Sequence, residues 1–276
     1  MQMRMFQHSW HGIDLTRLPA AKLAPDKPVG AEFYAQFYQL LASGQGSIEP
    51  GLLESKRQLG ETIQQNIIIP WQQQNGRPPK ILALAAGKAP VERVWCEHGH
   101  DLTFNDCQED SLVELRRAFP RAHFLIGDVF QIAPESKYDL ITAVTLDYVM
   151  DKRELIEFLV RVAGWLQPGG QIILYCASTL SFRQLAVETI KHVLGHYRRQ
   201  PHVFWGYWRT LGEFYDVAKS AGLQMRRLTN DPPGRLRLKS VTNFFSALPA
   251  LSNSHLIITL EPENGSSPNR SRSVSS

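Results

Sequence analysis

Short apolar runs alternate with amphipathic segments from residue 80 to residue 178. The apolar runs predict buried strands at residues 80–86, 101–106, 122–128, 138–146 and 171–178. Between them, residues 90–98, 109–119 and 151–166 place apolar side chains at the period of a helix. Strands that alternate with helices indicate βαβ units, so the pattern predicts an α/β fold with a doubly wound, mostly parallel sheet and helices on both faces.

The most regular helical pattern lies at residues 151–166, where Asp151 is suited to the N-cap. The apolar stripe of this helix consists of Leu155, Phe158, Leu159, Val162 and Leu166. The following Pro-Gly-Gly at 168–170 is expected to stop the helix before the strand at 171–178.

The segments on either side of this core have other patterns. Residues 1–29 show no sustained period and predict an irregular arm, while residues 30–79 predict a helical cap. The first cap helix carries Phe33, Phe37, Leu40 and Leu41 on one face, and the second is expected at 49–67, ended by Pro70.

After residue 178 we expect a helix at 182–196, an aromatic link at 202–208, a helix at 211–222, and strands at 223–229 and 255–262. A single α/β domain would then span residues 80–262. Residues 263–276 are polar and rich in serine, which predicts a disordered tail.

Composition narrows the class of protein. The chain has 276 residues, of which 43% are hydrophobic and 20% charged, and it contains no apolar run long enough to cross a membrane. Its first residues lack the apolar core of a secretory signal, and its three cysteines are an odd count without CxxC spacing. We therefore expect a cytoplasmic protein in a reducing compartment.

The net charge of +4 is unevenly distributed. Residues 181–240 contain 11 Lys and Arg against 4 Asp and Glu, which gives +7, and the remainder has 19 against 22, which gives −3. Such a basic segment can attract an anionic substrate, a nucleic acid or a membrane surface, although solvated helix faces would give the same count.

Candidate chemistry gathers where the predicted strands end, because ligands of doubly wound sheets bind beyond the carboxyl ends of the strands. The first strand is followed by a turn of small residues around Gly87. The second strand ends at Asp106, and its separation from Gly87 in the sequence suits a carboxylate that binds ribose hydroxyls. The third ends at Asp128 and the fourth at Asp147. A strand-ending Asp is by itself more often a turn former or helix cap.

Together these segments resemble the class I S-adenosylmethionine-dependent methyltransferases. The similar segments are ILALAAGKA, LTFNDCQEDSL, HFLIGDVF, YDLITAVTLDYVMD and, most specifically, LIEFLVRVAGWLQPGGQIILYCAS. The resemblance implies a seven-stranded sheet whose last strand is antiparallel, and S-adenosyl-L-methionine as cofactor. It also implies that Asp106 binds the ribose and Asp128 the adenine amino group.

In this resemblance the turn at Ala85, Ala86 and Gly87 holds the methionine part, and Leu146 and Asp147 line the methyl-donor side. Their neighbours Cys107, Val129 and Thr145 complete the implied cofactor site. The chain departs from the family at the glycine-rich turn. Where the family has an acid and three spaced glycines, this sequence has Ala83, Ala85, Gly87 and Ala89. We expect alanine there only if φ is negative.

A hydroxyl acceptor would need a base, for which Asp147 is the first candidate and His202 the second. Tyr34, Tyr38, Tyr148, Tyr207 and Arg209 are candidate substrate-binding residues. Arg209 would bind an acidic group. The simpler alternative is that the aromatic residues of the first cap helix and of the 202–208 link pack helices onto the sheet.

Three further features are set aside. The cluster Cys96, His98, His100 and Asp101 has metal-like spacing but lies at the entry end of a strand, so we predict no metal site. Lys88 could reach the methionine carboxylate, but an exposed loop lysine is the simpler interpretation. The DPPG at 231–234 reads as a turn.

The leading hypothesis is methylation of a small molecule, on oxygen or nitrogen rather than carbon. Two alternatives stay open: an RNA or DNA methyltransferase that uses the basic region as a phosphate footprint, and a catalytically silent scaffold with the same fold. A homodimer also stays open.

Overall fold

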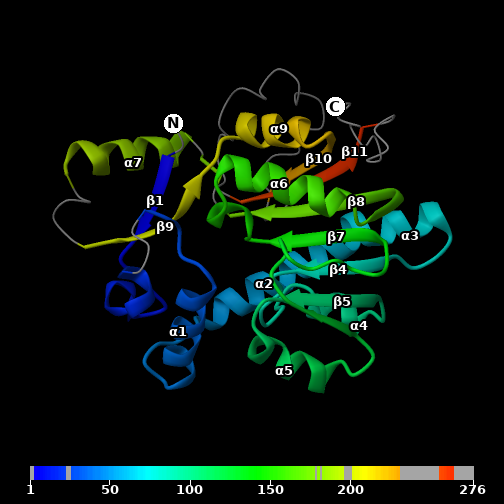
Figure 1. The fold of residues 1–276 in the computed structure, drawn as a ribbon, viewed down its shortest axis with the longest axis horizontal. Coiled ribbons are helices and arrows are strands. Elements are labelled where there is room, and N and C mark those ends of the chain that lie inside the picture. Colours follow the sequence, from blue (N-terminus) through cyan, green and yellow to red (C-terminus); the bar gives the residue numbers. More distant parts are fainter. Residues whose placement is uncertain are drawn as a thin grey trace, which may run out of the picture.

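The computed structural model describes residues 3–22, 26–177, 179–180, 182–195, 201–230 and 255–263. Its centre is a seven-stranded sheet with the order β6-β5-β4-β7-β8-β11-β10 (Figure 1). The strands are β4 (Lys80–Leu84), β5 (Asp101–Asp106), β6 (His123–Ile126), β7 (Tyr138–Val144), β8 (Leu166–Cys176), β10 (Leu223–Asn230) and β11 (Leu256–Pro262). Strands from β6 to β8 are parallel, whereas β11 is antiparallel to both of its neighbours. The predicted fold class is confirmed.

Helices cover both faces of the sheet, and the alternation along β4 shows how. Leu82 and Leu84 pack with α6 and α9 in one apolar cluster, while Ile81 and Ala83 pack with α2, α4 and α5 in another. The bounds of these helices are α2 (Pro50–Ile63), α4 (Arg93–Glu97), α5 (Glu109–Ala118), α6 (Lys152–Ala163) and α9 (Leu211–Ser220). A strand buried on both sides explains the nearly continuous apolar run.

Helix α6 begins as the sequence predicts. Asp151 is the N-cap: the Glu154 backbone N–H donates to Asp151 Oδ1 and the Asp151 N–H donates to Glu154 Oε2, both at 2.8 Å. This capping box satisfies two backbone donors that a helix start otherwise leaves unpaired.

The end of α6 differs from the prediction. The helix ends at Ala163, and β8 already starts at Leu166, so the Pro-Gly-Gly segment lies inside the strand. Tyr138 pairs with Leu166 and Leu140 with Gln171, which leaves the residues between 166 and 171 as an irregularity in the ladder. The turn residues therefore interrupt strand pairing rather than separate helix from strand.

Pro70 does not end the second cap helix, contrary to the prediction. Helix α2 passes through a π-helical turn, Gln64–Ile68, into α3 (Ile69–Asn75), which ends at the left-handed Gly76. In the π turn the Ile69 N–H already bonds five residues back, to Gln64 O. Because Pro70 then lies in the first turn of α3, its missing N–H costs little.

Two segments that were predicted to be irregular, the arm at residues 1–29 and the link at 202–208, each contain a strand, so the prediction is wrong for those residues. Residues 3–7 form β1 (Met3–Gln7), which is antiparallel to β9 (Val203–Trp208) in a separate two-stranded sheet. Smaller elements precede α1 (Ala31–Ala42): β2 (Ser9–Trp10), β3 (Ile13–Asp14) and two 3₁₀ turns. Figure 1 shows α1 and the β1–β9 sheet beyond the ends toward which β7 and β8 point.

The helix expected after residue 181 is α7 (Phe182–Val193). The DPPG turn and the tail from residue 264 lie outside the described residues. No described helix combines the length and the apolar character needed to cross a bilayer.

Candidate functional site

Asp106 joins three strand ends through its carboxylate and its backbone carbonyl. The Gly87 N–H donates to its Oδ2 at 2.8 Å, and the Gln108 N–H donates to its Oδ1 at 2.9 Å. The Gly127 N–H donates to the Asp106 carbonyl at 2.9 Å. The side chain is only 9% exposed. The predicted neighbourhood of Gly87 and Asp106 is therefore present, at the carboxyl ends of β4, β5 and β6.

Asn105 holds the same strand ends together, a role that the sequence did not reveal. Its Nδ2 donates to the carbonyls of Leu125 and Gly127, both at 2.9 Å, and its Oδ1 accepts the Ala85 N–H at 3.4 Å. An amide carries both donors and an acceptor, so this side chain serves three strand ends at once. We call Ala85, Gly87, Asn105, Asp106 and Gly127 the strand-tip network.

The turn after β4 has left-handed backbone at all three positions where the resembled family has glycine. φ is +47° at Ala85, +55° at Gly87 and +47° at Ala89. The expectation that alanine requires negative φ here is therefore wrong. Hydrogen bonds fix the turn, because the Ala86 N–H donates to Asn105 O at 2.8 Å and the Ala89 N–H to Ala86 O at 2.7 Å. The left-handed conformation costs about 1 kcal/mol or more in free energy at each alanine.

Asp128 and Asp106 of the strand-tip network both lie close enough to the Cys107 thiol to affect its pKa. Burial, together with the negative charges of Asp106 and Asp128, raises the pKa of the Cys107 thiol to about 11. Asp128 is exposed, and its Oδ1 accepts the Phe130 N–H at 2.8 Å, as in an Asx turn. The following Val129 is buried. The two predicted carboxylates thus act on one shared thiol.

The end of β7 is strained and partly buried. Thr145 has φ +56°, unusual for a β-branched residue, and its N–H donates to Tyr175 O at 2.9 Å. Leu146 is half-buried, and the buried Asp147 opens a 3₁₀ turn, Asp147–Val149. Such strain at a strand end near charged groups is typical of functional sites.

Arg209 is fully buried, at 0% exposure. Its Nη2 donates to the carbonyls of Asp147, at 3.3 Å, and Met150. Burial lowers the pKa of Arg209, while the charge of Asp147 opposes this shift. The guanidinium positions the turn after β7, and this geometry does not support the prediction that it binds an acidic substrate.

An aromatic cluster packs around Tyr148 of this turn, with rings from the N-terminal elements and from β9. The hydroxyls of Tyr34 and Tyr148 are 2.6 Å apart, and the rings of Tyr148 and Trp205 are parallel, with centroids 6.3 Å apart. Burial raises the pKa of both tyrosines. We call the set the aromatic cap, which consists of Trp10, Phe33, Tyr34, Phe37, Tyr148 and Trp205.

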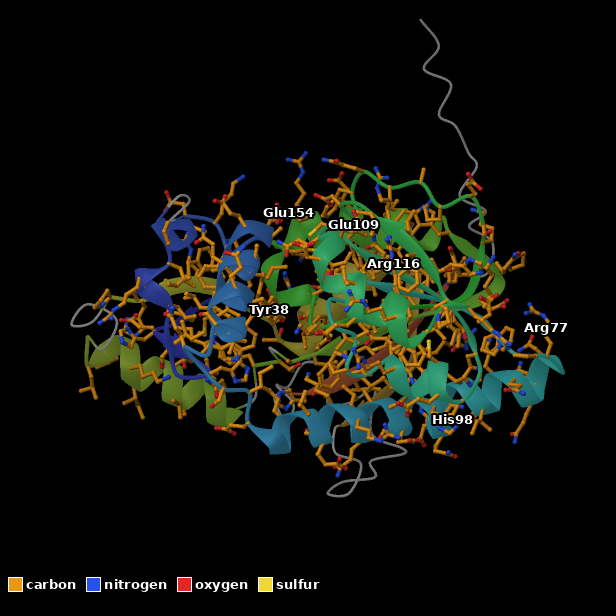
Figure 2. All side chains as sticks on the ribbon, turned by 90° about the horizontal axis from the view of Figure 1, so that it is seen from below. Tyr38, Arg77, His98, Glu109, Arg116 and Glu154 are labelled. Atoms are coloured by element: carbon orange, nitrogen blue, oxygen red, sulfur yellow. The ribbon has the colours of Figure 1, made fainter. Side chains whose placement is uncertain are left out.

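Tyr38 connects the aromatic cap to the strand-tip network. It lies on α1 (Figure 2), and burial, followed by the charge of Asp106, raises its pKa. A second connection comes from Gln108, whose Nε2 donates to Ala31 O at 2.7 Å at the start of α1. The predicted residues Tyr34, Tyr38 and Tyr148 are therefore brought together beside the strand ends.

Tyr207 lies on β9, and His202 lies directly before that strand. Tyr207 packs edge-on against Phe204, with ring centroids 5.2 Å apart, and pairs with Arg4 of β1. His202 lies beside His8, with ring centroids 5.9 Å apart. β9 approaches Tyr148 at Gly206. His202 is four residues before Gly206, which corresponds to roughly 13 Å along a strand. The structure does not bring His202 to Asp147.

The other candidates have local partners. Lys88 Nζ lies 3.6 Å from Glu114 of α5. His100 Nε2 lies 2.9 Å from Gln64 Nε2, and His98 (Figure 2) lies 3.4 Å from Glu61. Within the described part of the chain, no three His, Cys, Asp or Glu side chains are grouped so that they could hold a metal ion.

Known proteins resemble this chain in structure only. No protein-family profile and no curated sequence matches it. The magnesium protoporphyrin IX methyltransferase of Synechocystis is 12% identical with TM-score 0.54, over 83% of this chain and 94% of that one. Mitomycin 7-O-methyltransferase is 15% identical with TM-score 0.54, and the match covers 84% of this chain and 63% of that one.

An S-adenosylmethionine-dependent methyltransferase of Clostridium acetobutylicum is 14% identical with TM-score 0.51, over 83% of this chain and 97% of that one. At these identities the matches establish the fold, and they agree with the strand order and the antiparallel β11. The chain therefore has the fold of the class I S-adenosylmethionine-dependent methyltransferases.

Proposed function

We propose that this protein transfers a methyl group from S-adenosylmethionine to a small-molecule acceptor, on oxygen or nitrogen. The observation that carries the proposal is the strand-tip network around Asp106. Two structural neighbours support the cofactor, because the Synechocystis enzyme was solved both with bound SAH and with bound SAM. Residues 80–262 would form the methyl-transfer domain, with residues 30–79 as its cap.

The residues present suit a nucleoside. A carboxylate offers about four lone-pair positions. A backbone N–H takes one on each oxygen of Asp106, and the Cys107 thiol also donates to Oδ1. Capacity for ribose hydroxyls is therefore left on a side chain already fixed in orientation. A side-chain carbon at Gly87 would meet no atom within 4 Å, so the backbone has open space beside it. Asp128 would bind the adenine amino group, and the 85–87 turn the methionine part.

The chain's own contribution to methyl transfer would be positioning and exclusion of water, since in-line displacement from a sulfonium depends largely on both. When bound, S-adenosylmethionine supplies the activated methyl group. Asp147 stays the proposed base for a hydroxyl acceptor. Tyr34, Tyr38 and Tyr148 would line the acceptor site with apolar ring surface and hydroxyl groups, which suits an apolar or aromatic acceptor with a polar handle.

Calorimetric titration with S-adenosylmethionine tests the proposal. Removing the carboxylate in Asp106→Ala should weaken binding at least tenfold, because charge-assisted hydrogen bonds contribute about 1.5–3 kcal/mol each. Asp101→Ala is the matched control, since Asp101 is an exposed aspartate at the opposite end of the same strand.

The control should bind like the unmodified protein. Equal affinity for Asp106→Ala and the unmodified protein would contradict the assignment of the site. Absence of cofactor binding by the unmodified protein would instead favour a scaffold that keeps the fold without the reaction.

A further inference from the structure

The hydroxyl pair of the aromatic cap has one proton more than its own hydrogen bond uses. The Tyr34 and Tyr148 hydroxyls lie 2.6 Å apart, so one O–H group donates to the other oxygen. Two hydroxyls carry two protons, and the bond between them uses one. Among the residues that the structure describes, none accepts the second proton. The pair therefore offers one donor to whatever lies beside it.

The other partner of this pair is also a donor. The indole N–H of Trp205 hydrogen bonds to Tyr148, and the two rings lie parallel. An indole nitrogen can only donate, so it occupies a lone pair of Tyr148 and accepts no proton. Whichever tyrosine donates within the pair, one O–H group stays available. A ligand atom that satisfies this group must accept a hydrogen bond.

The cap hydroxyls stay protonated at neutral pH. Burial raises the pKa of Tyr38, and the negative charge of Asp106 acts in the same direction. Burial likewise raises the pKa of Tyr148, and the charge of Asp147 adds to the effect. A phenol whose pKa is raised above its usual value of about 10 keeps its proton, so these groups remain neutral donors.

The charges around the cap disfavour an anionic ligand. The carboxylates of Asp106 and Asp147, which act on Tyr38 and Tyr148, would repel a second negative charge placed beside these rings. Arg209, a cation next to the same turn, is fully buried and donates to backbone carbonyls. A neutral acceptor atom therefore suits this surface better than a carboxylate does.

The tyrosines lie at the boundary between the packed cap and solvent, where a ligand can reach them. Tyr34 and Tyr148 are half-buried, and Tyr38, one turn after Tyr34 on α1, is 37% exposed. The neighbouring side chains are aromatic, and the Trp205 ring packs edge-on against Tyr34 with centroids 5.9 Å apart. Such a surface suits a flat, apolar ligand body.

We propose that the Tyr34–Tyr148 pair selects acceptor molecules that carry a neutral carbonyl oxygen, as in a ketone or an amide, on a planar apolar body. The carbonyl accepts the available O–H group, and the rings of the aromatic cap pack against the apolar body. An ammonium group would place a donor against a donor, and a carboxylate would meet like charge. This inference rests on the proposed methyl transfer, since it names the class of molecule that the acceptor site takes.

Three aromatic probes test this selection on the full-length protein. Acetophenone, benzylamine and benzoate present a carbonyl, an ammonium group and a carboxylate on the same ring, and saturation-transfer NMR measures their dissociation constants. Acetophenone should bind about fivefold more tightly than either of the others, the factor expected of one net hydrogen bond.

The double variant Tyr34→Phe, Tyr148→Phe removes both hydroxyls. It should bind acetophenone about fivefold more weakly, while its affinity for benzylamine should not fall. Each single variant keeps one O–H group and should lose less. Tyr215→Phe is the matched control, because this exposed ring lies on α9, and it should bind all three probes like the unmodified protein. Thermal unfolding verifies that each variant is folded under the assay conditions.

Equal affinity for acetophenone and benzylamine would overturn the proposal, as would tighter binding of benzoate or no binding of any probe. Undiminished binding of acetophenone by the double variant would also overturn it. Calorimetric titration with S-adenosylmethionine separates this inference from the proposed function, because the double variant leaves the strand-tip network intact and should keep its cofactor affinity. Selection of acetophenone by a protein that binds no cofactor would contradict methyl transfer and support the carbonyl site.

Discussion

The strand-tip network and the aromatic cap are assembled in different ways. The network comes from residues 85–127 of one chain region, and polar bonds between neighbouring strand ends hold it. The cap joins residues near 10, 34, 148 and 205, and ring packing with one hydroxyl pair holds it. We therefore expect that the proposed cofactor site and the proposed acceptor site can be changed separately, because each side is held by its own set of bonds.

The largest effect is expected from the network. Asn105→Ala removes three hydrogen bonds from a buried side chain and leaves the Leu125 and Gly127 carbonyls without that partner. We expect a loss of about 3 kcal/mol in the free energy of unfolding, measured by urea denaturation. The tyrosine hydroxyl contact of the cap should be retained in the folded variant.

A control for this variant is Thr142→Val on β7. Thr142 is also buried, but its hydroxyl has no hydrogen-bond partner among the described residues. This change should cost little or be stabilising, because it removes an unsatisfied polar group. Equal costs for the two substitutions would mean that the Asn105 bonds do not hold the strand ends.

The next largest effect is expected where β9 crosses the turn after β7. A side-chain carbon at Gly206 would lie 2.5 Å from Tyr148 O and 2.6 Å from Tyr148 Cδ2. Gly206→Ala should therefore displace Tyr148 and destabilise the protein by about 2 kcal/mol, measured by thermal unfolding. Cofactor affinity should change less than the affinity for the acceptor.

Gly51→Ala serves as the comparison, because a side-chain carbon at this position in the first turn of α2 meets no atom within 4 Å. It should be neutral or slightly stabilising. If Gly206→Ala were equally harmless, the close approach of β9 to Tyr148 would be incorrect.

A smaller effect is expected from the hydroxyl pair of the cap. Tyr34→Phe and Tyr148→Phe should each cost about 1 kcal/mol, and the double variant should cost less than their sum because both remove one bond. Urea denaturation of the four proteins of this cycle measures the coupling. Tyr215→Phe, on an exposed ring of α9, should have no effect. Strict additivity would show that the two hydroxyls do not interact.

The difference between the two sides also explains what the sequence could predict. Strands and helices between residues 80 and 178 follow periodic patterns that come from local burial, and Asp106 stands at a characteristic spacing after Gly87. The pairing of β1 with β9 joins residues about 200 positions apart. A contact between segments so far apart leaves no periodic pattern in the sequence. The arm at residues 1–29 and the link at 202–208 are therefore predicted to be irregular.

Buried positions were the other source of error. Arg209 was expected in a substrate site because the sequence shows a cation among aromatic residues, but burial and backbone carbonyls determine its role. The sequence does not single out Asn105 beside Asp106, because an amide at a strand end carries no signal of what it bonds. Only the three-dimensional register of β4, β5 and β6 shows that one amide reaches all three.

The smallest predicted effect concerns the alanines of the turn after β4. Ala85→Gly should stabilise the protein by about 0.5 kcal/mol, because relief of the left-handed penalty slightly exceeds the entropy that glycine loses on folding. Ala89 has the same φ but is fully buried, so Ala89→Gly also loses a packed methyl group, worth about 0.8 kcal/mol. Thermal unfolding should rank Ala85→Gly above Ala89→Gly. The reverse order would mean that the penalty at Ala85 is absent, and that the turn holds alanine without strain.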